Sequence, residues 1–298
     1  MISIFLFKYI FIYYVITLAK HYMSNKSPLR YPGGKSKACK VIEAELLNND
    51  IDLKEFTTLI SPFFGGGSFE FYLQNKYSYT VKANDKFTPL MSFWTSAKNN
   101  NEELYNLVKD IKAAGFSKEK FTAFRKDIMN IDIDSTNEKL KQAAYYFAIN
   151  RSSFSGATLS GGFSKESSEK RFTTNSIKLI ANLDLSKFQF SNEDANDFIK
   201  EHTVTHATEK QLIFLDPPYY LEEKSKLYGC NGDMHEDFDH AALAETLNTT
   251  ANAWAMTYND CQYIRDLYKD YRIIDMKWNY GMNKSKKSSE ILILNRTQ

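Results

Sequence analysis

Short apolar runs alternate with longer amphipathic stretches along the chain after residue 24. The runs are rich in β-branched or aromatic residues and are bounded by polar or turn-forming residues, which is typical of buried strands. Between several runs the apolar positions recur every three or four residues, as in helices that bury one face. This alternation predicts an α/β fold. Strands are predicted over residues 57–60, 79–83, 188–190, 211–214, 252–258, 271–278 and 291–294.

Three successive helical patterns interrupt the alternation, over residues 100–114, 117–130 and 137–149. Ser117 precedes the second of them, as an N-cap residue would. We therefore divide the chain into an α/β part, residues 25–95 and 185–298, and an inserted, mainly helical part, residues 96–184. Further helices are predicted over residues 36–47, from residue 68 onwards, and over residues 239–247 and 261–269.

The hydrophobic segment of residues 1–24 differs in composition from everything after it. Residues 2–19 are almost wholly apolar and are long enough to be a candidate membrane span. They lack the basic start and small-residue cleavage site of a signal peptide. Two interpretations stay open: a hydrophobic anchor, or sequence upstream of a true start at Met23, where the chain turns polar. We favour the second, and in either case we expect a helix.

Overall composition is that of an ordinary globular protein, with 43% apolar and 25% charged residues among 298. The net charge is only +2, so any affinity for nucleic acid has to come from local basic patches. Three cysteines without metal spacing indicate a reducing compartment and no disulfide framework. His202 and His206 are four residues apart but lack a nearby third ligand, so we expect no metal site.

Asp216, Pro217, Pro218 and Tyr219 follow the predicted strand at residues 211–214 directly. The two prolines end that strand, because neither can donate a backbone hydrogen bond. An acid, rigid carbonyls and an aromatic ring are thus expected at the carboxyl edge of the sheet, where open α/β sheets bind ligands. Such groups can accept hydrogen bonds from an exocyclic amine and stack on a flat base. A strand-ending turn with a surface acid explains these residues equally well.

A glycine loop, Gly65 to Gly67, lies between a predicted strand and a predicted helix. This is the first half of a nucleotide-binding βαβ unit, but position 70 is Glu70 where the dinucleotide fingerprint has glycine. A ligand without phosphates is therefore favoured. Asp85 ends the next strand, 18 residues after Gly67, close to the distance at which an acid meets ribose hydroxyls. The alternative for Asp85 is an N-cap of the following helix.

Other polar segments suggest ligand or polymer contact. Residues 29–37 contain Gly-Lys-Ser but lack the earlier glycine of a phosphate loop, so we expect a turn that faces a ligand. Residues 150–164 are glycine-rich and include Arg151 and two phenylalanines, which a mere linker would not need. The basic stretch of residues 283–289 is suited to phosphate contacts. A basic cluster over residues 112–126 fits a DNA contact or a solvated helix face equally.

Five motifs occur in a fixed order: Pro-Gly-Gly-Lys at 32–35, Pro-Phe-Phe-Gly-Gly-Gly at 62–67, Asn-Asp at 84–85, Asn-Arg-x-x-Phe at 150–154 and Asp-Pro-Pro-Tyr at 216–219. Together they resemble the Dam-type (D12) class of DNA adenine-N6 methyltransferases, over about residues 29–295. The resemblance implies a Rossmann-like fold that binds S-adenosyl-L-methionine, with a mainly helical target-recognition domain inserted. It also implies double-stranded DNA as substrate, base flipping and EC 2.1.1.72.

The resemblance also implies roles for individual residues. Contacts to the cofactor are expected from Tyr31, Lys35, Phe64, Gly65, Gly67, Asp85, Asp194 and Asp216. Asp216, Pro217, Pro218 and Tyr219 are expected to be catalytic, and DNA contacts are expected from Arg151, Ser153, Phe154, Lys284, Lys286 and Lys287. Two positions depart from the family pattern. Ser61 stands where an acid is frequent, and Phe-Ser-Gly-Ala replaces the Phe-Asn-Gly-Leu of enzymes that recognise GATC.

The implied chemistry suits these residues. The Asp216 carboxylate and the Pro217 carbonyl would accept both N–H bonds of the adenine amine and aim its lone pair at the sulfonium methyl. Alternatives are the same chemistry on an RNA adenine or a protein glutamine amide, and a non-catalytic DNA-binding module. The large insert with its basic loop favours duplex DNA. We expect a cytoplasmic monomer, in a bacterial or phage-infected cell, that needs no metal and whose partners could include a cognate restriction endonuclease.

Overall fold

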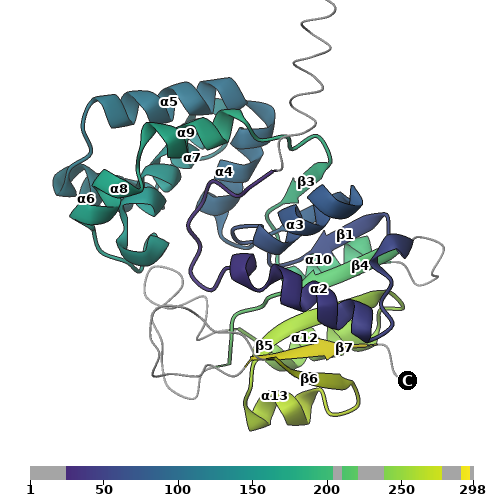
Figure 1. Ribbon diagram of the computed structural model, residues 1–298. Helices are drawn as coiled ribbons and strands as arrows, with labels where there is room; N and C mark the ends of the chain where they lie inside the picture. The colour runs from purple at the N-terminus through teal and green to yellow at the C-terminus, as the bar shows by residue number, and fades with distance from the viewer. Residues whose placement is uncertain (1–24, 204–209, 221–237, 277–289, 296–298) are drawn as a thin grey trace, which may run out of the picture.

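The computed structural model describes residues 25–203, 210–220, 238–276 and 290–295 (Figure 1). These residues form a sheet of seven strands in the order β3-β2-β1-β4-β5-β7-β6. Strands β1 to β5 pair in parallel, and β7 runs antiparallel to both β5 and β6. All seven predicted strands are confirmed, and their described ends differ from the predicted ends by a few residues at most. They are β1 (Thr58–Ser61), β2 (Thr80–Asn84), β3 (Phe188–Ser191), β4 (Gln211–Leu215), β5 (Ala253–Asn259), β6 (Arg272–Met276) and β7 (Glu290–Leu294).

The predicted helices are also present, although residues 36–47 are divided between a short 3-10 turn and a helix. They correspond to η1 (Lys35–Lys37), α2 (Cys39–Asn48), α3 (Ser68–Tyr77), α5 (Asn101–Ala113), α6 (Lys118–Asp127), α7 (Thr136–Ser152), α12 (His240–Asn248) and α13 (Gln262–Leu267). The apolar patterns did not predict η2 (Leu53–Glu55), η3 (Phe154–Gly156), α8 (Lys165–Lys170), α9 (Thr174–Ala181) or α10 (Ala195–His202), which are single turns or short helices. The helix α4 (Thr88–Asn99) was considered only as the helix that Asp85 could cap.

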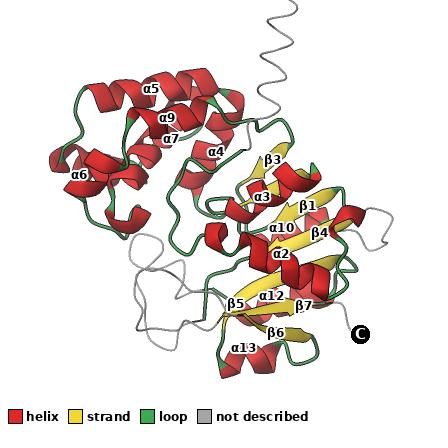
Figure 2. Ribbon diagram, viewed as in Figure 1, coloured by secondary structure: helices red, strands yellow, loops and turns green. Residues whose placement is uncertain are grey.

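Helices cover both faces of the sheet, because neighbouring residues of each strand point to opposite sides. Leu212 and Phe214 of β4 belong to the core that includes α2 and α3. Ile213 and Leu215 belong to a second core, to which α10 and α12 contribute. All five residues of β4 are buried, which explains why its sequence is a continuous apolar run. Figure 2 shows the resulting layers of helix, sheet and helix.

A separate group of helices lies beside the sheet rather than on its faces, between β2 and β3 in the chain (Figure 1). It contains α5 to α9 and packs onto the sheet part through α4, which contacts α7. Residue 96, where the insert was expected to start, falls inside α4. The helical character expected for residues 96–184 is therefore present in the structure.

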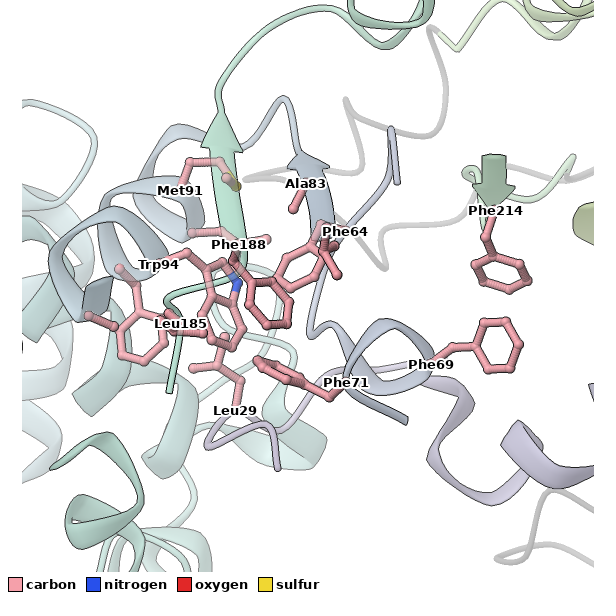
Figure 3. Packing of buried hydrophobic residues seen from close by; sticks show 14 of the residues in the cluster. Leu29, Phe64, Phe69, Phe71, Ala83, Met91, Trp94, Leu185, Phe188 and Phe214 are labelled. Atoms are coloured by element: carbon pink, nitrogen blue, oxygen red, sulfur yellow. The ribbon is translucent and has the colours of Figure 1, made fainter. Parts of the chain in front are cut away.

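An aromatic cluster joins α4 to the glycine loop. Figure 3 shows Phe64, Phe71, Trp94 and Phe188 gathered beside β2 and β3, where Phe188 is the first residue of β3. The rings of Phe64 and Trp94 meet edge to face, with centroids 5.2 Å apart. The indole N–H of Trp94 donates to the Gly65 carbonyl oxygen at 3.0 Å, so this buried helix holds the loop in place.

In the part of the chain that the structure describes, no helix has both the length and the apolar character needed to cross a membrane. The apolar stretch of residues 2–19 lies outside the described residues.

Replacing Trp94 by Phe should destabilise the fold by about 1–3 kcal/mol, because the Gly65 carbonyl loses its buried donor. Trp254 provides the control, since it is equally buried but its indole N–H has no acceptor among the described residues. Urea unfolding should show a smaller loss for Trp254→Phe than for Trp94→Phe. Equal losses would mean that the hydrogen bond contributes nothing beyond ring volume.

Candidate active site

The site lies where β1 and β4 are neighbours in the middle of the sheet. On either side of this pair the strand order runs in opposite directions, and open α/β sheets bind ligands at such a switch point, beyond the carboxyl ends of the strands. The glycine loop follows β1, and Asp216 follows β4. Two motifs about 150 residues apart in the sequence therefore meet at one edge, as we predicted.

Lys35 connects the first motif to Asp216. Its Nζ lies 2.7 and 2.9 Å from the two carboxylate oxygens of Asp216 and 2.9 Å from the hydroxyl oxygen of Tyr219. A second carboxylate, Glu290, lies 3.8 Å from the same Nζ. The Lys35 side chain is 3% exposed and that of Asp216 is 25% exposed, so the pair is held at the boundary between the core and solvent. The structure thus places Lys35, expected at the cofactor, against the acid expected to be catalytic.

Thr257 also holds Asp216 in place, donating its hydroxyl to Oδ1 at 2.8 Å. The register of β4 and β5 pairs Leu215 with Met256, which brings Thr257 beside Asp216. Glu290 arrives from the other direction, because β7 is antiparallel and its first residue pairs with Asn259 at the end of β5. Sequence reasoning did not identify Thr257 or Glu290. The single acid at the start of an otherwise apolar strand was the only available signal for Glu290.

The glycine loop is packed against aromatic rings. A methyl group added at Gly65 would lie 2.8 Å from the Tyr31 ring, and one added at Gly67 would lie 2.4 Å from the Phe64 ring. Both glycines also have positive φ, +50° and +66°, which other residues rarely adopt. Tyr31 and Lys35 belong to one turn, so this turn contacts both the glycine loop and Asp216.

Two acids lie at the ends of the neighbouring strands β2 and β3. Asp85 accepts hydrogen bonds from the backbone amides of Gly65, at 2.9 Å, and Phe87, at 3.0 Å. Burial raises the pKa of Asp85 to about 6, and the two amide hydrogen bonds oppose this shift. The N-cap position of α4 is Phe87, so the alternative role of Asp85 as that cap is wrong. Asp194 caps α10 through the Asn196 amide and pairs with Lys86 at 3.1 Å.

Glu70 is a buried acid. From the sequence it was noted only because the dinucleotide fingerprint has glycine at its position. It lies in the first turn of α3, and Oε1 accepts a hydrogen bond from the Ser61 hydroxyl at 2.7 Å. Burial and, to a smaller extent, the nearby charge of Asp216 raise the pKa of Glu70, Ser61 and Lys35 oppose the shift, and the net value is about 7. Because this pKa lies above the ordinary value, ionisation of Glu70 opposes folding as the pH rises from about 4.5 to about 7.

Comparison with known proteins identifies the chemistry. A family model described as D12 class N6 adenine-specific DNA methyltransferase matches residues 31–282. The chain belongs to this family. It is also similar to the type II methyltransferase M.CviBI of Paramecium bursaria Chlorella virus NC1A, with 22% identity over 275 residues, which cover 89% of this chain and 96% of that protein. The protein is therefore an adenine-N6-specific DNA methyltransferase, EC 2.1.1.72, which confirms the resemblance seen in its motifs.

The methyltransferase carries a group of arginines where α7 ends. Arg151 is the last basic residue of α7, and burial together with Arg30 and Arg171 lowers its pKa to about 10. Arg30 donates to the Ser153 carbonyl at 3.0 Å and the Ser167 hydroxyl at 3.1 Å. Within the described ranges, no salt bridge joins any of the three arginines to an acid.

Residues expected to contact DNA have different environments. The ring of Phe154 is 69% exposed on η3, whereas Ser153 is fully buried and its hydroxyl donates to the Asn150 carbonyl. Lys284, Lys286 and Lys287 lie outside the described residues. The described part of the methyltransferase contains no group of three or more His, Cys, Asp or Glu side chains that could hold a metal ion, and His206 falls outside it.

Replacing Lys35 by Met should destabilise the methyltransferase by about 3–5 kcal/mol, because Asp216 and Glu290 would lose their shared cation in a buried environment. Lys86→Met removes a surface pair of the same type and should cost less than about 1 kcal/mol. Urea unfolding at neutral pH compares the two. Adding Glu290→Gln to Lys35→Met should restore part of the loss, and a single Lys35→Met variant as stable as the parent would contradict the ion-pair account.

Proposed function

We propose that the methyltransferase transfers the methyl group of S-adenosyl-L-methionine to N6 of an adenine flipped out of double-stranded DNA at a specific sequence. The observation that carries this proposal is the meeting of the glycine loop, Asp85 and the Lys35–Asp216 pair at the carboxyl edge of β1, β2 and β4. The glycine loop and Asp85 suit a nucleoside, and the adjacent Asp216 suits an exocyclic amine.

The residues present fit S-adenosyl-L-methionine. The absent side chains of Gly65 and Gly67 make room for the rings of Tyr31 and Phe64, which would lie beside the cofactor with the loop. Asp85 would accept from the ribose hydroxyls, since each of its oxygens retains a lone pair beside its amide hydrogen bond. Asp194, one strand further along the sheet, would lie towards the adenine, with Phe64 beneath the loop. The bound cofactor supplies an electrophilic methyl group on its sulfonium sulfur.

Asp216 would orient the target amine. Lys35 and Thr257 fix its carboxylate, and the remaining lone pairs can accept an N–H bond of adenine N6. The Pro217 carbonyl would accept the second N–H bond, so that the nitrogen lone pair is directed at the methyl group. Pro218 keeps this backbone rigid, and the Tyr219 ring would stack on the flipped base. Positioning of this kind can contribute several kcal/mol to the barrier reduction.

The helices α5 to α9, with residues 150–164, would form the DNA target-recognition domain. Arg30, Arg151 and Arg171 support this role, because among the described residues no acid pairs with them and their positive charges can attract phosphates or base edges. The exposed ring of Phe154 is beside them in the chain and available to bases. Lys284, Lys286 and Lys287 would add phosphate contacts. The residues Phe-Ser-Gly-Ala at 154–157 give no reason to expect GATC as the target.

The biological setting is proposed from the relative. M.CviBI is named as a type II methyltransferase, and this chain would likewise belong to a restriction-modification system with a cognate endonuclease. We also propose that it acts as a monomer in the cytoplasm.

Asp216→Ala should abolish methyl transfer, because the amine would lose its acceptor, while affinity for duplex DNA should stay within a few fold. Asp275→Ala is the matched control, since this acid lies on β6, at the far end of the sheet order. Transfer of a tritiated methyl group to DNA, RNA and total protein measures the activity and the substrate class together. Retained transfer in the Asp216→Ala protein, or a preference for RNA or protein, would refute the proposal.

Arg151→Lys should reduce discrimination between target and unrelated DNA, because lysine cannot make the paired hydrogen bonds that arginine makes to guanine. The expected loss is about 1–3 kcal/mol, with little change in affinity for unrelated DNA. Arg272→Lys, on the edge strand β6, is the control. Binding measured over a range of salt concentrations separates the outcomes. A uniform loss with a shallower salt dependence would assign Arg151 to a phosphate instead.

A further inference from the structure

Glu70 is a buried acid next to the glycine loop. It belongs to the first turn of α3, its side chain is buried, and Ser61 at the end of β1 donates to it. The glycine loop is the short connection between these two elements, so Ser61 and Glu70 mark its two ends. The hydroxyl of Ser61 fixes the carboxyl group there, and both residues are almost completely excluded from solvent.

Several carboxyl groups gather around Lys35 among the described residues. Lys35 pairs with Asp216 at 2.7 Å and faces Glu290 at 3.8 Å, while Glu70 interacts electrostatically with both Lys35 and Asp216. The Cys39 thiol, from α2, adds no charge, because burial raises its pKa to about 12. Ionising a carboxyl group as buried as that of Glu70 is costly, and a cation placed beside it would offset part of that cost.

We propose that Glu70, held by Ser61, is the carboxylate that receives the ammonium group of the methyl donor. This inference rests on the proposed function, because the ammonium group belongs to the methionine part of S-adenosyl-L-methionine. Its positive charge is opposite to that of an ionised Glu70 carboxylate. A ligand that lies along the glycine loop, with its ribose at Asp85, has its other end towards Ser61 and Glu70. Glu70 therefore replaces the acid that is absent at position 61.

Binding of the ammonium group should also change the protonation of Glu70. Without ligand, Glu70 is about half protonated near pH 7, because burial raises its pKa to about 7. An ammonium group beside it favours the ionised form, so binding should release a proton. The release should be larger at pH 6.5 than at pH 8.5, where Glu70 is already mostly ionised. The groups facing Glu70 are Ser61 from β1, Lys35 from η1, Cys39 from α2 and Asp216 after β4.

The first test uses the unaltered protein and two ligands. S-Adenosylhomocysteine keeps the ammonium group, whereas 5′-methylthioadenosine has the same nucleoside without it. Calorimetric titration at pH 6.5, in two buffers of different ionisation enthalpy, counts the protons released by each ligand. Asp85 and Asp194 meet the nucleoside in both cases, so their contributions cancel. Release with S-adenosylhomocysteine alone supports the proposal, and equal release with both ligands overturns it.

The second test removes the charge. Glu70→Gln should weaken S-adenosylhomocysteine binding by about 10- to 100-fold, abolish the extra proton release and leave methylthioadenosine affinity within about twofold. Glu43→Gln is the matched control, because Glu43 is also a buried acid, on α2, but it is paired with Lys76 and the hydroxyls of Tyr72 and Tyr77. Circular dichroism confirms folding, and if Glu70→Gln does not fold, the two-ligand comparison decides.

Ligand binding distinguishes failure of the proposed function from failure of the role of Glu70. If the unaltered protein binds neither nucleoside, the proposed function is wrong and this inference falls with it. If it binds both ligands but Glu70→Gln binds S-adenosylhomocysteine as tightly as the parent does, only the role of Glu70 is wrong.

Discussion

The ion pair between Lys35 and Asp216 determines how the catalytic edge is built. Its partners are 181 residues apart in the sequence, yet they meet at 2.7 Å in a setting where Lys35 is almost fully buried. A carboxylate at the partly buried end of a central strand is stabilised by a nearby positive charge. Lys35 supplies that charge from a turn that precedes the whole sheet in the chain. Thr257 then fixes the orientation of the carboxylate.

The same turn also links the catalytic edge to the helical part. Arg30 and Asn150 exchange hydrogen bonds through their backbone and side-chain groups, at 2.9 and 2.6 Å. A methyl group added at Gly156 would lie 2.6 Å from Arg30, so the loop after α7 is pressed closely against the turn. Tyr31, the next residue, lies on the glycine loop. The short stretch of residues 30–35 therefore connects the arginine group, the glycine loop and Asp216.

The sequence predicted most of the fold because its signals are local. Continuous apolar runs marked strands such as β4, and the glycines at 65 and 67 marked a close approach that the rings of Tyr31 and Phe64 explain. It could not predict Thr257 and Glu290, since their roles depend on strand register and on the antiparallel direction of β7. Asp85 was located correctly at a strand end, but whether it caps α4 depended on a two-residue shift of the helix start.

Glu70 shows most clearly why a motif comparison and a structure differ. In the sequence it is a mismatch to the dinucleotide fingerprint, and Ser61 is a departure from the family pattern. In the structure Ser61 donates a hydrogen bond to Glu70. The serine at position 61 and the acid at position 70 therefore lie at the same place in the fold. The fold brings the strand end and the first turn of the following helix together, so a side chain from either one reaches the same place. A residue-by-residue comparison sees two separate differences where the packed molecule has one hydrogen-bonded pair.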